Sequence, residues 1–150
     1  MSYQFVKLLH ILSATVLIGT GGGSAFYLFI SYKKASFTTL KEVLSFVVLG
    51  DMIFTTPAVI MQGLTGLWLA DALSLTYSTW FWVVIAVSTA ALVTWLPAAY
   101  IQIKLKKMIA DKEERPPEFD RLITIWAALG VPSFGSAIYI YYLMLFKPFI

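Results

Sequence analysis

The sequence predicts an all-α, polytopic membrane protein whose four transmembrane helices form an up-and-down bundle. Of its 150 residues, 59% are hydrophobic and only 13% are charged, whereas soluble domains usually carry about 25% charged residues. The hydrophobic residues fall into four segments, each with the roughly 20 residues that a helix needs to cross the hydrocarbon core. A chain of this length predicts a single integral membrane domain, residues 1–150.

The four predicted helices are separated by three connections and span about residues 3–31, 43–70, 80–103 and 122–146. Only the third connection, residues 104–121, is strongly charged. Its Pro116-Pro117 pair predicts an extended break, because proline lacks a backbone N–H and restricts the residue before it. Pro57 lies inside the second helix, and we expect it to bend that helix.

Basic residues predict the sidedness of the bundle. Nine of the eleven lysines and arginines lie in or beside the first and third connections, and only Lys7 and Lys147 belong to the other side. The positive-inside rule therefore predicts both termini outside and loops 1 and 3 in the cytoplasm. Around the second connection, Trp68, Trp80 and Trp82 are typical of the aromatic belt at a membrane surface.

Composition also limits the classes of function. The absence of cysteine excludes disulfides, thiolate metal sites and cysteine nucleophiles. A net charge of +3, located in the loops, does not favour nucleic acid as a partner. The first segment lacks a cleavage site before a soluble domain, so we expect a retained helix. The expected surroundings are the lipid bilayer, with a second copy or a redox subunit as partner.

Polar side chains line one face of each of the first two predicted helices, at about 100° per residue. These faces hold His10, Ser13, Leu17, Thr20 and Ser24 on the first helix, and Asp51, Thr55, Ala58, Gln62 and Thr65 on the second. Because polar groups at membrane depth normally face the bundle interior, we expect the two faces to point inward, toward each other. Ordinary interhelical hydrogen bonding is the alternative to a functional role.

His10 is the only histidine, and an ionisable group at membrane depth is by default a functional-site hypothesis. Counted from Tyr3 at about 1.5 Å per residue, it lies roughly 10 Å inside the outer interface. The same count on the other helices predicts as its neighbours Met61, Gln62, Thr65, Ile138 and Tyr139. Asp51 falls nearer the cytoplasmic side, so a direct His10–Asp51 pair is not expected.

Three roles for His10 are open. It can bind haem iron as an axial ligand, with its second ring nitrogen oriented by a carbonyl or hydroxyl. A single histidine then leaves a five-coordinate iron or a His/Met site with Met61. It can relay protons near neutral pH, or it can form hydrogen bonds across helices. A non-haem metal site has too few ligand residues.

A run of glycines follows His10 on the first helix: Gly19, Gly21, Gly22 and Gly23. A phosphate-binding loop needs a strand before it, which continuous apolar helix excludes. Gly19 and Gly23 match the G-x-x-x-G spacing of close helix packing. The alternative is that Gly19 and Gly21 make room for a flat cofactor.

Several motifs occur in one order over essentially the whole chain. They are Lys7-Leu-Leu-His10, Asp51-Met-Ile-Phe-Thr-Thr-Pro57, Thr65-Gly66, Trp95-Leu-Pro97 with Gln102, and Met144-Leu-Phe-Lys147-Pro148. As a set they resemble an uncharacterised (DUF-type) family of bacterial predicted integral membrane proteins. The resemblance implies a multi-pass protein of the bacterial inner (cytoplasmic) membrane and brings no activity with it.

More distantly, a lysine three residues before a histidine in the first of four membrane helices is similar to two further groups. These are the J-type membrane protoporphyrinogen oxidases, whose helix-one histidine binds haem b, and the copper-resistance D membrane domain. The J-type enzymes also have a lysine early in the third membrane helix, where this chain has Trp80-Phe-Trp-Val-Val84. What the resemblance implies is therefore a haem-ligand role, and only for His10.

The leading hypothesis is an inner-membrane protein that binds haem b or another porphyrin through His10. It would serve electron transfer, or act as a membrane oxidoreductase or its subunit, with a cofactor site formed by His10, Met61, Gln62, Tyr139, Gly19 and Gly21. The alternative is a non-catalytic membrane component or a small oligomeric proton-coupled transporter that uses His10 and Asp51. The sequence leaves open whether the protein is an enzyme.

Overall fold

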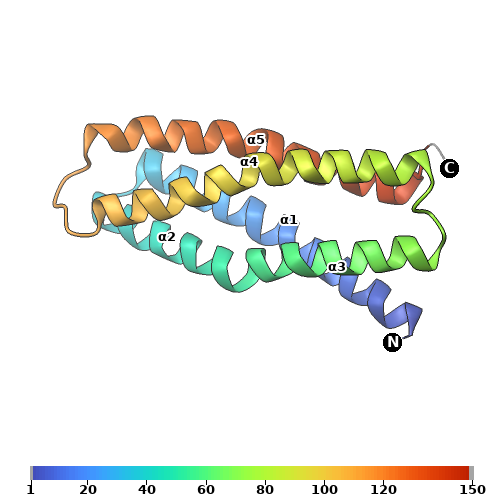
Figure 1. The fold of residues 1–150 in the computed structure, drawn as a ribbon. Coiled ribbons are helices and arrows are strands. Elements are labelled where there is room, and N and C mark those ends of the chain that lie inside the picture. The colour runs from blue at the N-terminus through green and yellow to red at the C-terminus, as the bar shows by residue number, and fades with distance from the viewer. Residues whose placement is uncertain (1, 149–150) are drawn as a thin grey trace.

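The computed structural model describes residues 2–148 and is built from helices (Figure 1). Their bounds are α1 (Tyr3–Lys34), α2 (Phe37–Gly50), η1 (Asp51–Thr55), α3 (Thr56–Ala72), α4 (Thr79–Ile109) and α5 (Pro117–Phe146). The segments α2, η1 and α3 follow one another without a break as one helix of 36 residues. That helix and α1, α4 and α5 are each long and apolar enough to span a membrane. The prediction of an all-α protein with four spans is confirmed, and residues 2–148 contain no strand.

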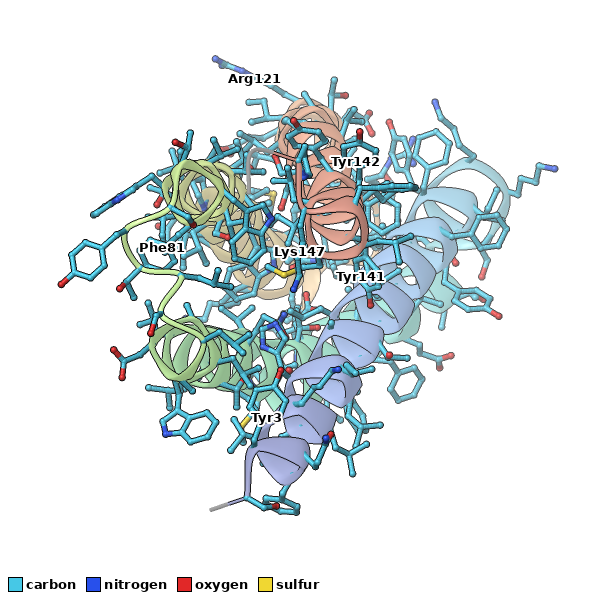
Figure 2. The ribbon with its side chains drawn as sticks, turned by 90° about the vertical axis from the view of Figure 1, so that its right-hand side faces the viewer. Tyr3, Phe81, Arg121, Tyr141, Tyr142 and Lys147 are labelled. Atoms are coloured by element: carbon cyan, nitrogen blue, oxygen red, sulfur yellow. The ribbon has the colours of Figure 1, made fainter. Side chains whose placement is uncertain are left out.

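Successive long helices run in opposite directions along the bundle (Figure 1). Both ends of the chain lie at one end of the bundle, and the α1–α2 and α4–α5 connections lie at the other. Helices α4 and α5 pack against each other most extensively, whereas α1 packs mainly against α3 and α2. Figure 2 looks onto the end that holds Tyr3 and Lys147, where α1 diverges from the α4–α5 pair.

The helices extend beyond the predicted apolar segments. Helix α4 continues to Ile109 and α5 begins at Pro117, so the third connection is much shorter than the predicted residues 104–121. The charged residues at these ends are mostly lysine and glutamate, which are good helix formers. The length of the apolar segment therefore indicates how much of a helix can lie in the hydrocarbon core, whereas the helix itself is longer. Pro116 is extended (ψ 147°), and Pro117 starts α5, where a missing N–H is tolerated.

The long second helix contains a π-helical segment, η1, which ends two residues before Pro57. The backbone N–H of Thr56 bonds to the carbonyl of Asp51, five residues back. Because a proline ring crowds the carbonyl four residues earlier and offers no N–H, a widened turn relieves the conflict. The expected effect of Pro57 thus takes the form of a π segment, a feature that is frequent at functional sites.

The main core lies toward the end of the bundle that holds the α1–α2 and α4–α5 connections. Its fully buried side chains are Leu28, Leu40, Leu44, Leu105, Ile109, Phe119 and Ile123. A smaller cluster at the other end contains Trp80, whose indole N–H donates to the carbonyl of Leu143 (2.7 Å). Trp80 is only 5% exposed, so its assignment to an aromatic belt was wrong. Burying an indole is favourable when its N–H finds an acceptor.

Candidate functional site

The imidazole of His10 lies between α1 and α3 and is bonded through both ring nitrogens. Nδ1 is 2.9 Å from the Thr65 hydroxyl, and Nε2 is 3.1 Å from the side-chain nitrogen of Gln62. The Ser13 hydroxyl donates to the side-chain oxygen of Gln62 at 2.6 Å. These four side chains, His10, Ser13, Gln62 and Thr65, are called the His10 cluster below.

The hydrogen bonds of the His10 cluster assign the histidine tautomer. The Thr65 hydroxyl donates its proton to the Met61 carbonyl, so it accepts the bond from His10 Nδ1–H. The Nε2 lone pair then accepts from the Gln62 amide, whose oxygen accepts from Ser13. Both ring nitrogens thus have partners, one as donor and one as acceptor, as in a neutral imidazole.

The predicted neighbours of His10 divide into two groups. Gln62 and Thr65 contact the ring, as depth counting predicted. Met61 meets the cluster only through its carbonyl, and its side chain is 38% exposed. On α5, Tyr139 stacks on Tyr142 (centroids 5.9 Å apart) and is 44% exposed. No hydrogen bond of the described residues joins Met61 or Tyr139 to the imidazole.

Among the α1 glycines, Gly22 is the one that approaches another helix, since a Cβ there would lie 3.1 Å from the Phe134 ring. A methyl group added at Gly19, Gly21 or Gly23 would meet nothing within 4 Å, so the G-x-x-x-G pair Gly19 and Gly23 makes no close helix contact within this chain. The glycine that approaches His10 is Gly66 on α3, where an added Cβ would lie 3.1 Å from the ring carbon Cε1. The neighbouring Thr65-Gly66 pair therefore lets α1 and α3 come together at the imidazole.

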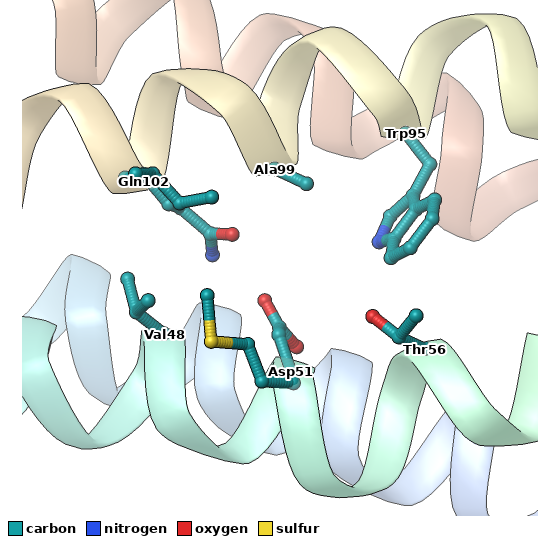
Figure 3. Close-up of a pocket in the computed structure, with 8 residues that line it drawn as sticks. Val48, Asp51, Thr56, Trp95, Ala99 and Gln102 are labelled. Atoms are coloured by element: carbon teal, nitrogen blue, oxygen red, sulfur yellow. The ribbon is translucent and has the colours of Figure 1, made fainter.

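A second polar centre surrounds Asp51, which is 9% exposed. The Thr55 hydroxyl donates to Asp51 Oδ1 at 2.7 Å. The Gln102 amide on α4 is assigned with its nitrogen donating to Asp51 Oδ2 (2.9 Å), because its oxygen then accepts from the Trp126 indole N–H (3.2 Å). Figure 3 shows Asp51 and Gln102 pointing toward each other across the space between the two helices.

The carboxyl group of Asp51 has hydrogen-bond donors but, among the described residues, no salt-bridge partner. Its two carboxylate oxygens accept hydrogen bonds from Thr55 and Gln102. The salt bridges within residues 2–148 join Lys104 to Glu118 and Arg115 to Asp120, at the end of the bundle. A carboxyl group at this depth without a cation is energetically costly when it is ionised.

Two cavities meet at Asp51. The smaller, of about 50 Å³, lies between the long second helix and α4 and includes Thr56, Trp95 and Gln102 in its wall (Figure 3). It has room for a few water molecules, each of which needs roughly 10–15 Å³. The larger, of about 410 Å³, is a groove between α1 and α2. Its lining residues are Gly19, Thr20, Gly23, Ser24, Tyr27, Val43, Phe46, Val47, Gly50 and Asp51.

The two polar faces meet as the sequence predicted, except at Asp51, which turns toward α4. Besides the contacts of the His10 cluster, Thr20 on α1 lies 3.2 Å from the Thr55 hydroxyl, hydroxyl to hydroxyl. His10 and Asp51 have separate partners, so no direct pair forms, also as expected. Gln102, the partner of Asp51, was not among the predicted site residues. A glutamine at matching depth near the C-terminal end of the third segment was the available signal.

In this conformation, His10 has no free ring nitrogen to offer to a haem iron. Both His10 nitrogens are already bonded, so iron would have to displace the Gln62 amide or the Thr65 hydroxyl. Polar side chains thus converge at two places, the His10 cluster and the surroundings of Asp51.

Comparison with known proteins identifies a family. No curated protein matches the chain, and no solved structure matches it either. One family model, described as "Predicted integral membrane protein (DUF2269)", matches residues 4–148. The match covers all four spans and both polar centres. The chain therefore belongs to this family of predicted integral membrane proteins.

Proposed function

We propose that the protein is a non-catalytic membrane component that binds and releases a proton at Asp51. The observation that carries this proposal is a buried carboxyl group with two hydrogen-bond donors and, among residues 2–148, no salt-bridge partner. Such groups inside membrane helices typically belong to proton or ion pathways. The cavity between Asp51 and α4 has room for water, and Asp51, Thr56 and Gln102 place polar groups in its otherwise apolar wall.

Proton binding changes the direction of one hydrogen bond. The ionised Asp51 accepts from the Thr55 hydroxyl. A protonated Asp51 has a proton to donate to Thr55, whose own hydroxyl can then turn toward Thr20, 3.2 Å away. Through this contact, proton uptake at η1 would change the hydrogen bonding between η1 and α1.

The proposed setting is the bacterial inner membrane, with both termini outside and the α1–α2 and α4–α5 connections in the cytoplasm. The asymmetry of lysine and arginine supports this orientation. Four helices offer little interior for a transport pathway, so we propose that transport coupled to Asp51 would need a homo-oligomer.

Infrared titration tests the proton proposal directly. In protein reconstituted in lipid, the C=O band of a protonated carboxyl group should appear and disappear with pH, and Asp51→Asn should remove that band. Asp71→Asn is the matched control, since Asp71 is exposed in the last turn of α3. Circular dichroism checks the fold of both variants. A titrating band that is identical in all three proteins would refute the proposal.

Haem b ligation by His10 is the second candidate, with electron transfer or membrane oxidoreduction beside a redox subunit as its function. It is favoured by the place of His10 on the inward face of α1, between helices. Loading would require Gln62 to release Nε2, the nitrogen that carries the lone pair. Gln62→Ala should then strengthen the Soret band of protein expressed with ample haem, and His10→Ala should abolish it. Colourless wild-type and Gln62→Ala proteins would exclude this candidate.

A further inference from the structure

We propose that the protein binds the head group of an anionic phospholipid at Tyr32, near the end of α1. The phosphate site consists of Lys33 on α1 and Arg115 in the α4–α5 connection, which both lie beside the Tyr32 ring. The end of α1 and this connection lie at the same end of the bundle (Figure 1). The inference goes beyond the proposed role of Asp51 and does not depend on it.

The ring of Tyr32 holds two cations in place. Lys33 Nζ is 5.1 Å and Arg115 Cζ is 5.0 Å from the ring centroid, both within the range of cation–π attraction. The ring is itself fixed, because its hydroxyl donates to Asp120 Oδ1 (3.0 Å) and its face packs near Phe119 (centroids 6.3 Å apart). Two cations from distant parts of the chain are thereby brought within reach of one lipid head group.

The charges at Tyr32 are not balanced within the protein. Among residues 2–148, Asp120 is the carboxyl group that forms a salt bridge with either cation, and it contacts Arg115 Nε at 3.2 Å. The two terminal nitrogens of the guanidinium then remain for phosphate oxygens, and Lys33 adds an ammonium group. Two cations and one carboxylate leave one positive charge, which the single negative charge of a phosphodiester balances.

An apolar surface continues from this site toward the middle of the membrane. Phe29 lies one turn before Lys33, with its ring centroid 5.7 Å from Nζ, and Phe26 follows on the same face. The two phenylalanines are 45% and 61% exposed. Because Lys33 is in the last turn of α1, its ammonium group reaches the membrane surface while these rings face lipid chains. A phosphate that carries acyl chains therefore fits this surface better than a free phosphate ion.

Basic sites beside membrane helices recognise lipid head groups by charge, and native mass spectrometry can test this here. Full-length protein in a neutral detergent is titrated with phosphatidylglycerol or phosphatidylcholine of the same acyl chains. We expect the first phosphatidylglycerol to bind about tenfold more tightly, because the choline cation is repelled by Lys33 and Arg115. A large excess of glycerol 3-phosphate should not displace it. Equal affinities for the two lipids, or displacement by glycerol 3-phosphate, would overturn the inference.

Two charge-matched substitutions locate the site. Arg115→Gln should weaken phosphatidylglycerol binding about fivefold, as expected for one basic residue near a membrane surface. Arg121→Gln removes the same charge but should have little effect, because Arg121 is exposed and points away from the bundle (Figure 2). Lys33→Gln is a second site variant in case the first does not fold. Equal losses at the site and at Arg121 would indicate diffuse attraction to basic residues and overturn the inference.

A pair of substitutions at Tyr32 tests whether its ring positions the two cations. Tyr32→Phe and Tyr32→Leu both remove the hydroxyl that bonds to Asp120, but only the phenylalanine variant keeps an aromatic ring. Tyr32→Phe should retain the preference for phosphatidylglycerol over phosphatidylcholine, whereas Tyr32→Leu should reduce it about fivefold. Circular dichroism checks the fold of both. An unchanged preference in a folded leucine variant would overturn the site at Tyr32.

Discussion

Asp51 on the long second helix and Gln102 on α4 meet at 2.9 Å, carboxyl oxygen to amide nitrogen. The same amide accepts from Trp126 on α5 (3.2 Å), and Thr55 carries the contact toward Thr20 on α1. All four spanning helices therefore contribute a side chain to the surroundings of one carboxyl group.

Gln102→Leu should destabilise the fold. It leaves the Trp126 N–H and one oxygen of Asp51 without partners, and a buried polar group left unpaired costs about 1–3 kcal/mol. The free energy of unfolding in mixed detergent micelles measures the change. Gln4→Leu is the control, since Gln4 is exposed in the first turn of α1. A similar small loss for both variants would contradict the assigned orientation of the Gln102 amide.

The His10–Thr65 hydrogen bond should appear as a coupling energy. In a double-mutant cycle with His10→Ala and Thr65→Val, we expect about 0.6 kcal/mol and at most roughly 1.7 kcal/mol, as measured for bonds between membrane helices. Unfolding free energies of the four proteins give the value. Replacing Thr65→Val by Thr15→Val should abolish the coupling, because Thr15 bonds only to its own helix. Additive effects in the first cycle would show that the bond does not form.

Gly66→Ala and Gly63→Ala should have opposite effects on stability. The new methyl group at Gly66 would lie 3.1 Å from the His10 ring, which Thr65 and Gln62 hold in place. At Gly63 it meets nothing within 4 Å, so the higher helix propensity of alanine should stabilise by up to about 1 kcal/mol. Melting temperatures compare the two. A gain at both positions would mean that the imidazole can move aside.

Cysteine labelling tests the orientation, and the chain has no native cysteine to interfere. Tyr77→Cys lies in the α3–α4 connection, where Tyr77 is 95% exposed, and should react with a membrane-impermeant maleimide in intact spheroplasts. Glu113→Cys, in the α4–α5 connection, should react only after lysis. The reverse pattern would place both termini in the cytoplasm.

The sequence allowed prediction of the spans and of the meeting between the two polar faces, because both follow from hydrophobic length and helical periodicity. It did not allow prediction of the direction in which Asp51 points. A regular helix would put Asp51 and Gln62, eleven residues apart, on one face. The π segment between them sends Asp51 toward Gln102 on α4, while Gln62 contacts α1.

The sequence also did not allow prediction of how closely individual residues pack against a neighbouring helix. Spacing alone cannot distinguish a glycine that permits close packing from one that borders a groove, and Gly66 and Gly23 are of these two kinds. Trp80 likewise resembles a membrane-surface residue in sequence, although the Leu143 carbonyl receives its indole N–H in the interior. Each of these outcomes depends on what a second helix places opposite the residue.

The π segment makes the number of residues between Gly50 and Pro57 matter as much as their identity. A π turn accommodates one residue more than an α turn, so deleting one residue there would let the helix close into regular α geometry. The two halves would keep their facing, because the deletion removes the residue that the widened turn accommodates. Asp51 and Gln62 would then be ten residues apart in a regular helix, about 80° apart around its axis, and Asp51 would still face Gln102. A deletion elsewhere in the long second helix would instead turn one half by about 100° relative to the other, so the π segment is the place where this helix best tolerates the loss of one residue.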